Sequence, residues 1–257
     1  MKKSISYLLI FIGIQLAGGA VMNLVWKLFT SSQDMSATQL IVATSVISVV
    51  VIALFILMRW ALVSPNWLRT RPWAVLAWCV IAAMGAIIPS MWLQEQMPEL
   101  PNLMENEFDF ILRNRWGYLA IGLLAPFSEE IVFRGAILRS LLSSSKLSSW
   151  GAIALSAFFF ALIHMNPAQM PHAFVIGLLL GWMYCRTGSI LPGVAYHWAN
   201  NSVAYVLYNL YPGSDIKLSD ILGGSQQHVL LAVGFSLVIL LPALYQLYLR
   251  MRPASEA

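Results

Sequence analysis

Residues 117–142 read GYLAIGLLAPFSEEIVFRGAILRSLL, an apolar stretch that carries Glu129, Glu130 and Arg134 near its middle. A helix needs about 20 mainly apolar residues to cross a bilayer, so this stretch is long enough. At about 2.5–3.5 kcal/mol for each charge at the bilayer centre, three isolated ions would cost roughly 8–10 kcal/mol. Ionisable residues at membrane depth usually serve a function, so the stretch predicts both a membrane protein and a functional site.

The composition of the chain points to the same class of protein. Hydrophobic residues make up 59% of the 257 residues and charged residues only 10%, too little charge for an ordinary soluble domain. Apolar segments fall at 5–26, 39–58, 72–93, 117–142, 149–166, 171–186, 188–210 and 228–249. They predict an all-α fold, a polytopic transmembrane helix bundle of about eight spans, with residues 1–257 forming a single membrane domain.

Charges between these segments predict the orientation of the bundle. With a cytoplasmic N-terminus, Glu256 and ten basic residues fall on the cytoplasmic side: Lys2, Lys3, Arg59, Arg69, Arg71, Arg139, Lys146, Arg186, Arg250 and Arg252. External loops receive Asp34, Glu95, Glu99, Glu105, Glu107, Asp109, Asp215 and Asp220. The positive-inside rule then predicts that both termini are cytoplasmic. We expect an integral protein of a bacterial cytoplasmic membrane. Its acidic loop 94–116 is expected to be a solvated connector, with a lid or an interfacial helix as the alternative.

The same composition argues against other partners. The net charge of +4 does not indicate nucleic-acid binding, because no basic run is longer than two residues. Cys79 and Cys185 lie in or at the end of apolar segments and form neither a disulfide framework nor a zinc-type pair. The lipid bilayer is the partner that the composition indicates directly.

Four polar residues from three segments are predicted to lie at a common depth. Counted from the cytoplasmic end at about 1.5 Å per residue, Glu129 lies about 20 Å deep and His164 about 22 Å. His197 and Asn201, one turn apart on one helix face, lie at about 14 and 20 Å. Independent packing residues would seldom share one level, so we expect the three segments to converge on one site.

The adjacent glutamates are expected to have different tasks. Glu130 and Arg134 stand at i and i+4, the spacing of an intrahelical ion pair. Glu129 points about 100° away from that pair round the helix, and one cation cannot neutralise both acids. We therefore interpret Glu130 and Arg134 as support, and Glu129 as the side chain that faces a cavity.

A carboxylate with two imidazoles and an amide suits hydrolysis of a peptide bond in or beside the membrane. Glu129 would take a proton from water as general base, and His164 would orient that water or share it through a metal. His197 and Asn201 would stabilise the oxyanion, where loss of one donor costs about 3–4 kcal/mol in other enzymes. Ser128 is an alternative nucleophile, but nothing places a histidine beside it.

Other interpretations of these residues stay open. A single histidine or asparagine in a spanning helix often serves only as an interhelical hydrogen-bonding group. The chain could thus be a non-catalytic membrane scaffold or an immunity protein that binds a peptide. Buried acids and histidines could also serve an ion- or proton-coupled transporter, although the sequence shows no internal repeat to support one.

Three motifs resemble those of a known family. Glu129-Glu130-Ile-Val-Phe-Arg134, Phe160-Ala-Leu-Ile-His164 and His197-Trp-Ala-Asn-Asn201 are similar in order and spacing to the EExxxR, FxxxH and HxxxN motifs of the CPBP family. That family includes type II CAAX prenyl endopeptidases and bacteriocin-processing or self-immunity proteins. The resemblance covers about 117–210, which we take as the catalytic core, while the flanking spans 1–116 and 211–257 carry no matching motif.

The resemblance implies an intramembrane endopeptidase of glutamic or metallo type. It implies that Glu129 is the base, that Glu130 and Arg134 support it, and that His164 positions water or binds a metal. His197 and Asn201 would form the oxyanion site or a second ligand pair. It further implies cleavage after an isoprenylated cysteine, although another hydrophobic or lipid-modified peptide or protein stays open as the substrate.

Members of this family are commonly described as metalloproteases, yet the sequence lacks an HExxH motif. Glu129, His164 and His197 could supply a two-histidine, one-glutamate zinc site with an open position. That use of Glu129 would remove the obvious base, because Glu130 is better explained by Arg134. We therefore favour water activation by Glu129 without zinc or another cofactor.

Overall fold

The computed structural model describes residues 1–30, 36–64, 67, 69, 71–144, 146–211 and 216–251, and no strand occurs among them. Its helices are α1 (Lys2–Phe29), α2 (Ala37–Leu57), α4 (Trp73–Glu95), α5 (Glu105–Leu112), η1 (Tyr118–Leu124), α6 (Ala125–Glu130), η2 (Ile131–Leu138), α7 (Arg139–Leu142), α8 (Ser149–Leu162), α9 (Met170–Thr187), α10 (Leu191–Leu210), α11 (Leu218–Ile221) and α12 (Gln226–Arg250). Four residues used to predict the orientation lie outside the described residues: Asp34, Asp215, Arg252 and Glu256.

Each of the eight apolar segments coincides with helical structure, which confirms the all-α prediction. Four of the helices, α1, α2, α4 and α12, are long and apolar enough to cross a membrane. The full number of eight spans and the cytoplasmic placement of the termini stay predictions.

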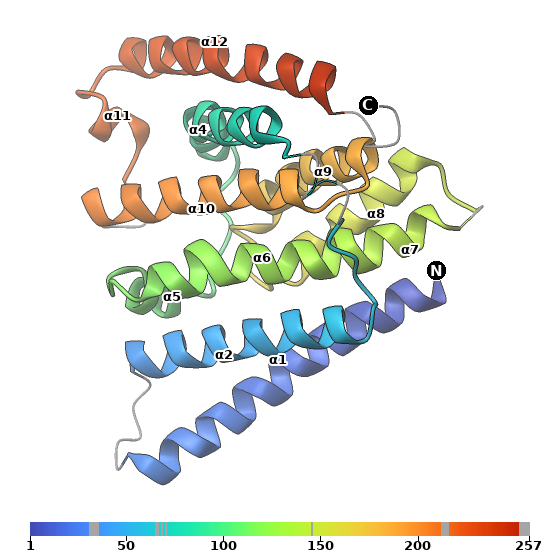
Figure 1. Cartoon of the computed structure of the whole chain (residues 1–257). Helices are drawn as coiled ribbons and strands as arrows, with labels where there is room; N and C mark the ends of the chain where they lie inside the picture. Colours follow the sequence, from blue (N-terminus) through green and yellow to red (C-terminus); the bar gives the residue numbers. More distant parts are fainter. Residues whose placement is uncertain are drawn as a thin grey trace.

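The segment 118–142 forms one uninterrupted helix at the centre of the bundle. Its pieces η1 and η2 are π-helical, and α6 and α7 are α-helical; π-helical turns are often found at functional sites. Figure 1 shows this helix, in green, between α2 and α10. All eight residues of η2 are buried, as expected for a helix that is apolar on every side. The charged residues of the motif therefore lie in the core.

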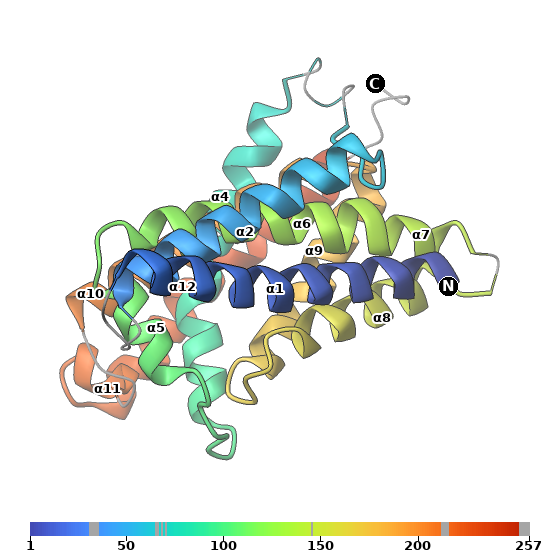
Figure 2. The same ribbon diagram turned by 90° about the horizontal axis from the view of Figure 1, so that it is seen from below.

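The outer helices present apolar side chains to their surroundings. Leu16 and Leu28 of α1 are 66% and 74% exposed, and Phe235 and Val238 of α12 are 70% and 69% exposed. Apolar surface on this scale is lipid-facing rather than water-facing. Further inside, α4 packs against α12 and α10, and Figure 2 shows it crossing the central helix steeply. The chain is an integral membrane protein.

Two local expectations need correction. Helix α8 ends at Leu162, four residues before the predicted end of that span. The reason is Pro167, which disfavours helical backbone at the preceding residue, and Met165 already has a positive φ of 50°. The acidic loop 94–116 is not only a connector, because it contains α5. That helix packs on α2 and α10, and its Ile111 is buried in a cluster with Ile41 of α2 and Ala120 of η1.

Candidate active site

The Glu130 and Arg134 side chains form a fully buried ion pair on the central helix. Arg134 Nη1 lies 2.7 Å from Glu130 Oε1, and the side chains are 1% and 0% exposed. Arg134 Nη2 also donates to the Gly177 carbonyl of α9 at 3.2 Å, and the guanidinium lies 4.5 Å from the centroid of the Phe160 ring of α8. The ion pair predicted from the spacing is present, and it fixes three helices to one another.

His197 of α10 lies between the two glutamates. Its Nδ1 is 3.1 Å from Glu130 Oε1, and its Nε2 is 3.7 Å from Glu129 Oε2. Because a carboxylate only accepts, we assign the Nδ1 proton to the bond with Glu130, which directs Nε2 toward Glu129. Sequence reasoning associated His197 with Asn201 and did not find this bridge.

A glycine allows α10 to approach Glu130 this closely. A Cβ atom added at Gly193 would lie 2.5 Å from Glu130 Oε2, which is shorter than any real non-bonded contact of this kind. Gly193 stands four residues before His197, on the same face of α10. Gly193 leaves space for the Glu130 carboxylate against α10, and His197 forms the hydrogen bond to it.

Glu129 differs from its neighbour because part of it stays accessible. Its side chain is 18% exposed, and His197 is its ion-pair partner among the described residues. Ser128, the alternative nucleophile, is buried and donates its hydroxyl to the Ala125 carbonyl at 2.9 Å. The Ser128 hydroxyl hydrogen is therefore engaged in a hydrogen bond within its own helix. The Glu129 carboxylate is accessible to a bound molecule.

His164 lies in the turn after α8 and not inside the helix as expected. Its Nδ1 donates to the Phe160 carbonyl at 2.8 Å, a helix-end acceptor, so Nε2 is left for another partner. The ring of Phe160 packs edge-on against His164 and His197, with centroids 5.0 and 5.7 Å apart. The Phe160 ring thus contacts His164, His197 and Arg134, and these contacts bring the three motifs together in space.

Asn201 lies one turn beyond His197 and joins α10 to the central helix. Its Nδ2 donates to the Ile121 carbonyl of η1 at 3.1 Å, and its Oδ1 accepts from Asn200 Nδ2 at 3.3 Å. One amide hydrogen is engaged in this way, and the second is available. Sequence reasoning placed Asn201 on the correct helix face but did not find its contact with η1.

His172 is a site residue that sequence reasoning missed. It lies in the first turn of α9 and lines the larger of the two cavities described below. It makes no hydrogen bond with another described residue. The signal was available in the sequence, since His172 is one of only four histidines and falls at the start of an apolar segment.

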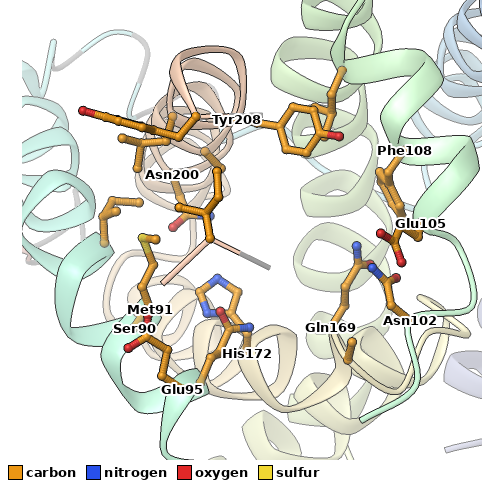
Figure 3. A pocket seen from close by; sticks show the side chains of 18 of the residues that line it. Ser90, Met91, Glu95, Asn102, Glu105, Phe108, Gln169, His172, Asn200 and Tyr208 are labelled. Carbon is orange, nitrogen blue, oxygen red and sulfur yellow. The ribbon is translucent and has the colours of Figure 1, made fainter. Parts of the chain in front are cut away.

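Two cavities lie beside these residues. The first, of about 560 Å³, is lined by both apolar and polar side chains, and we call it the polar cavity because the polar ones include Glu95, Glu105, His172, Asn200 and Tyr208. Figure 3 shows the His172 ring directed into this cavity. The second, of about 460 Å³, is lined by apolar side chains of α4, η1, α6 and α10: Leu76, Leu123, Leu124, Phe127, Leu191, Val194, Ala195 and Trp198. A substrate with a polar part and an apolar part has space for both.

The alternative zinc ligands Glu129, His164 and His197 are not gathered into a metal site in this structure, and independence from a metal stays a prediction. The described residues include no group of three His, Cys, Asp or Glu side chains placed to hold one. Nδ1 of His197 is bonded to Glu130, and Nδ1 of His164 is bonded to the Phe160 carbonyl, which leaves Nε2 of each histidine for another partner. No step of the chemistry is therefore derived through a metal.

Comparison with known proteins identifies this region. Residues 112–203 match the family model described as Rce1-like, type II CAAX prenyl endopeptidase. The matched segment contains all three motifs together with His172 and Gly193. No curated protein and no solved structure matches the chain.

Proposed function

We propose that the protein is an intramembrane endopeptidase, because residues 112–203 match the Rce1-like family model. Its substrate is a hydrophobic, membrane-associated or lipid-modified peptide, and its nucleophile is a water molecule activated by Glu129. One observation carries this proposal: Glu130 is fully buried on Arg134, whereas the adjacent Glu129 is partly exposed and faces His197. The chain thus presents one available carboxylate beside an imidazole.

In this mechanism Glu129 accepts a proton from water while the water oxygen attacks the scissile carbonyl carbon. The new C–O bond produces a tetrahedral oxyanion. When the C–N bond breaks, Glu129 returns its proton to the leaving amine nitrogen, so the products are a carboxylic acid and an amine. His164 orients the attacking water through its available Nε2, which holds the reacting atoms in place.

His197 and Asn201 stabilise the oxyanion in this proposal. In its doubly protonated form, His197 can donate from Nε2 while Glu130, bonded at Nδ1, balances its charge. The second amide hydrogen of Asn201 adds a donor one turn further along α10. Arg134 and Glu130 do not touch the substrate; they hold His197 in position.

The apolar cavity supports a hydrophobic substrate. It is lined by Phe127, two residues before Glu129, and by Trp198, directly after His197. The cavity therefore lies along α6 and α10, the two helices that carry Glu129 and His197, although none of the proposed catalytic side chains lines it. Burial of an apolar chain there would contribute about 25 cal/mol per Å² of apolar surface. A prenyl group is one such chain and an apolar peptide side chain is another.

We also propose that all eight predicted spans cross a bacterial cytoplasmic membrane with both termini in the cytoplasm. The catalytic core is 117–210, and 1–116 and 211–257 supply the flanking spans. Helices at all eight segments support this arrangement. Cysteine labelling from each side of the membrane, at the α7–α8 and α11–α12 connections, would place these loops on opposite sides if the proposal is correct.

The decisive experiment is Glu129→Gln, which removes the base with almost no change in shape. We expect peptide hydrolysis to fall by about 10²–10⁴-fold, the usual contribution of general base catalysis, with expression and thermal stability unchanged. Ser128→Ala is the matched control and should keep full activity. Comparison of membrane peptides from cells that carry the wild type or Glu129→Gln would identify the substrate. Full function of Glu129→Gln in cells would instead favour a non-catalytic scaffold.

Independence from metal is a separate part of the proposal. Purified, active protein should contain less than a stoichiometric amount of zinc by elemental analysis, and chelators should leave its rate unchanged. Loss of activity with a chelator, followed by recovery with zinc, would overturn this part and leave the role of Glu129 to be assigned again.

A further inference from the structure

The polar cavity lies at the end of the bundle occupied by α5 and α11, away from the N-terminus (Figure 1). Its walls are built by specific contacts. Asn166, fully buried, donates from Nδ2 to Asn102 Oδ1 at 2.8 Å and accepts from the Leu103 backbone N–H at 3.1 Å. Glu95 Oε1 accepts from the Leu218 N–H at 2.6 Å, which ties α11 to the end of α4. The cavity is thus part of the folded structure.

This cavity shares a wall with the candidate active site. His172, which lines the cavity, lies in α9, the helix whose Gly177 carbonyl accepts from Arg134. Asn200 also lines it and bonds to Asn201. A peptide held beside Glu129 could therefore continue directly into the polar cavity.

The lining of the cavity is acidic. Among the described residues it contains the carboxylates of Glu95 and Glu105 and no lysine or arginine; Figure 3 shows Glu105 beside Asn102 and Gln169, across the cavity from Glu95. Loop 94–116 carries five acids and two bases, and one of those bases, Arg113, is ion-paired with Asp109. A cationic ligand is favoured here by charge, and an anionic one is opposed.

We propose that this cavity is a subsite for a positively charged segment of the substrate that flanks the scissile bond. The inference rests on the proposed protease function and names the kind of peptide cleaved: an apolar segment followed or preceded by lysine or arginine. A peptide whose free C-terminal carboxylate entered the cavity would meet two like charges. The preferred cut is therefore internal, with basic residues on the cavity side.

The test uses three membrane-embedded reporter peptides with one apolar segment and a flanking segment of lysine, glutamine or glutamate. In proteoliposomes, the wild-type protein should cleave the lysine reporter fastest and the glutamate reporter slowest. The double variant Glu95→Gln and Glu105→Gln should reduce this lysine-over-glutamate ratio of kcat/KM by roughly tenfold, the effect of two partly exposed ion pairs. The amide oxygen introduced by Glu95→Gln can still accept the Leu218 N–H bond, so the fold should be kept.

Glu99→Gln is the matched control, because Glu99 is an exposed acid of the same loop that does not line the cavity. It should leave the ratio unchanged. Raising the salt concentration should lower the wild-type ratio but not that of the double variant. An unchanged ratio in the double variant, or a wild-type preference for the glutamate reporter, would overturn the proposal.

A binding measurement separates this inference from the protease function. Fluorescent reporters are titrated into the Glu129→Gln protein, where no cleavage is expected. Tighter binding of the lysine reporter, lost once Glu95→Gln and Glu105→Gln are added to that variant, would support the subsite even if the wild type cleaved nothing. Equal affinity for the lysine and glutamate reporters would reject the subsite even if cleavage by the wild type confirmed the protease function.

Discussion

Replacement of Arg134 by methionine should destabilise the protein because it leaves the Glu130 carboxylate in the core without its guanidinium partner. Both side chains are essentially inaccessible, and their closest atoms are 2.7 Å apart. Breaking a buried pair by removing one partner costs about 3–5 kcal/mol. For a chain of this size, each kcal/mol lowers Tm by about 2–4 °C. Arg134→Met should therefore lower Tm by about 6–20 °C.

The double variant Glu130→Gln with Arg134→Met distinguishes charge from packing. Replacing a buried ion pair by two neutral side chains of similar volume changes the free energy of unfolding little. The double variant should therefore recover most of the Tm that Arg134→Met loses. Arg113→Met is the matched control. Arg113 and Asp109 have the same i, i+4 spacing, but their side chains are 59% and 32% exposed, and we expect no measurable change in Tm.

Thermal unfolding of these variants can be measured by the reaction of the Cys79 thiol. Its side chain is fully buried, so a thiol-reactive dye can label it only after unfolding in detergent micelles. Cys185 is partly accessible and is replaced by alanine in every variant. If Arg134→Met unfolds at the same temperature as Arg113→Met, the buried-charge argument is wrong. If the double variant stays as unstable as the single one, lost packing and not the stranded charge explains the effect.

Three further predictions address the site and its surroundings. Gly193→Ala should greatly reduce hydrolysis, because its Cβ would lie 2.5 Å from Glu130 Oε2; wild-type kcat/KM in this variant would contradict that close approach. His164→Asn should lower kcat by about 10²-fold through loss of water orientation while Tm stays constant, and an equal fall in Tm would indicate a structural role instead. Hydrogen bonds from Tyr208 and Arg113 lower the pKa of Asp109. The ionised carboxylate therefore stabilises the packing of α5 at any pH above the ordinary pKa of about 3.9. This stabilisation is lost as the pH falls below that value and through the lowered pKa. Pepsin should therefore cut α5 only in that acidic range, and cutting at a constant rate up to about pH 5, well above that ordinary value, would refute this account.

Local patterns in the sequence predicted those features that depend on one segment at a time. Apolar runs predicted helices because a spanning segment must satisfy its backbone hydrogen bonds internally. The spacing of Glu130 and Arg134 predicted their ion pair because i and i+4 meet on any helix. The end of α8 was missed, although Pro167 was a signal for it, because the apolar run continues past the last helical residue.

Contacts between segments needed the folded structure. His197 and Glu130 are 67 residues apart, and no periodicity shows which ring nitrogen faces which carboxylate. His172 belongs to no motif, and its importance comes from the cavity into which it points. The two cavities are likewise formed by side chains from several helices, so no single segment indicates them.

The sequence by itself determined that this is a membrane-embedded helical protein with an acidic pair, two histidine motifs and a family resemblance over about 117–210. Hydropathy and helical spacing are local properties, and they are readable without a fold. Only the tertiary structure decided that the predicted Glu130–Arg134 pair is fully buried and that His197 joins the two glutamates. Those outcomes depend on how closely α8, α9 and α10 approach the central helix, which is set by packing at residues such as Gly193 and Phe160.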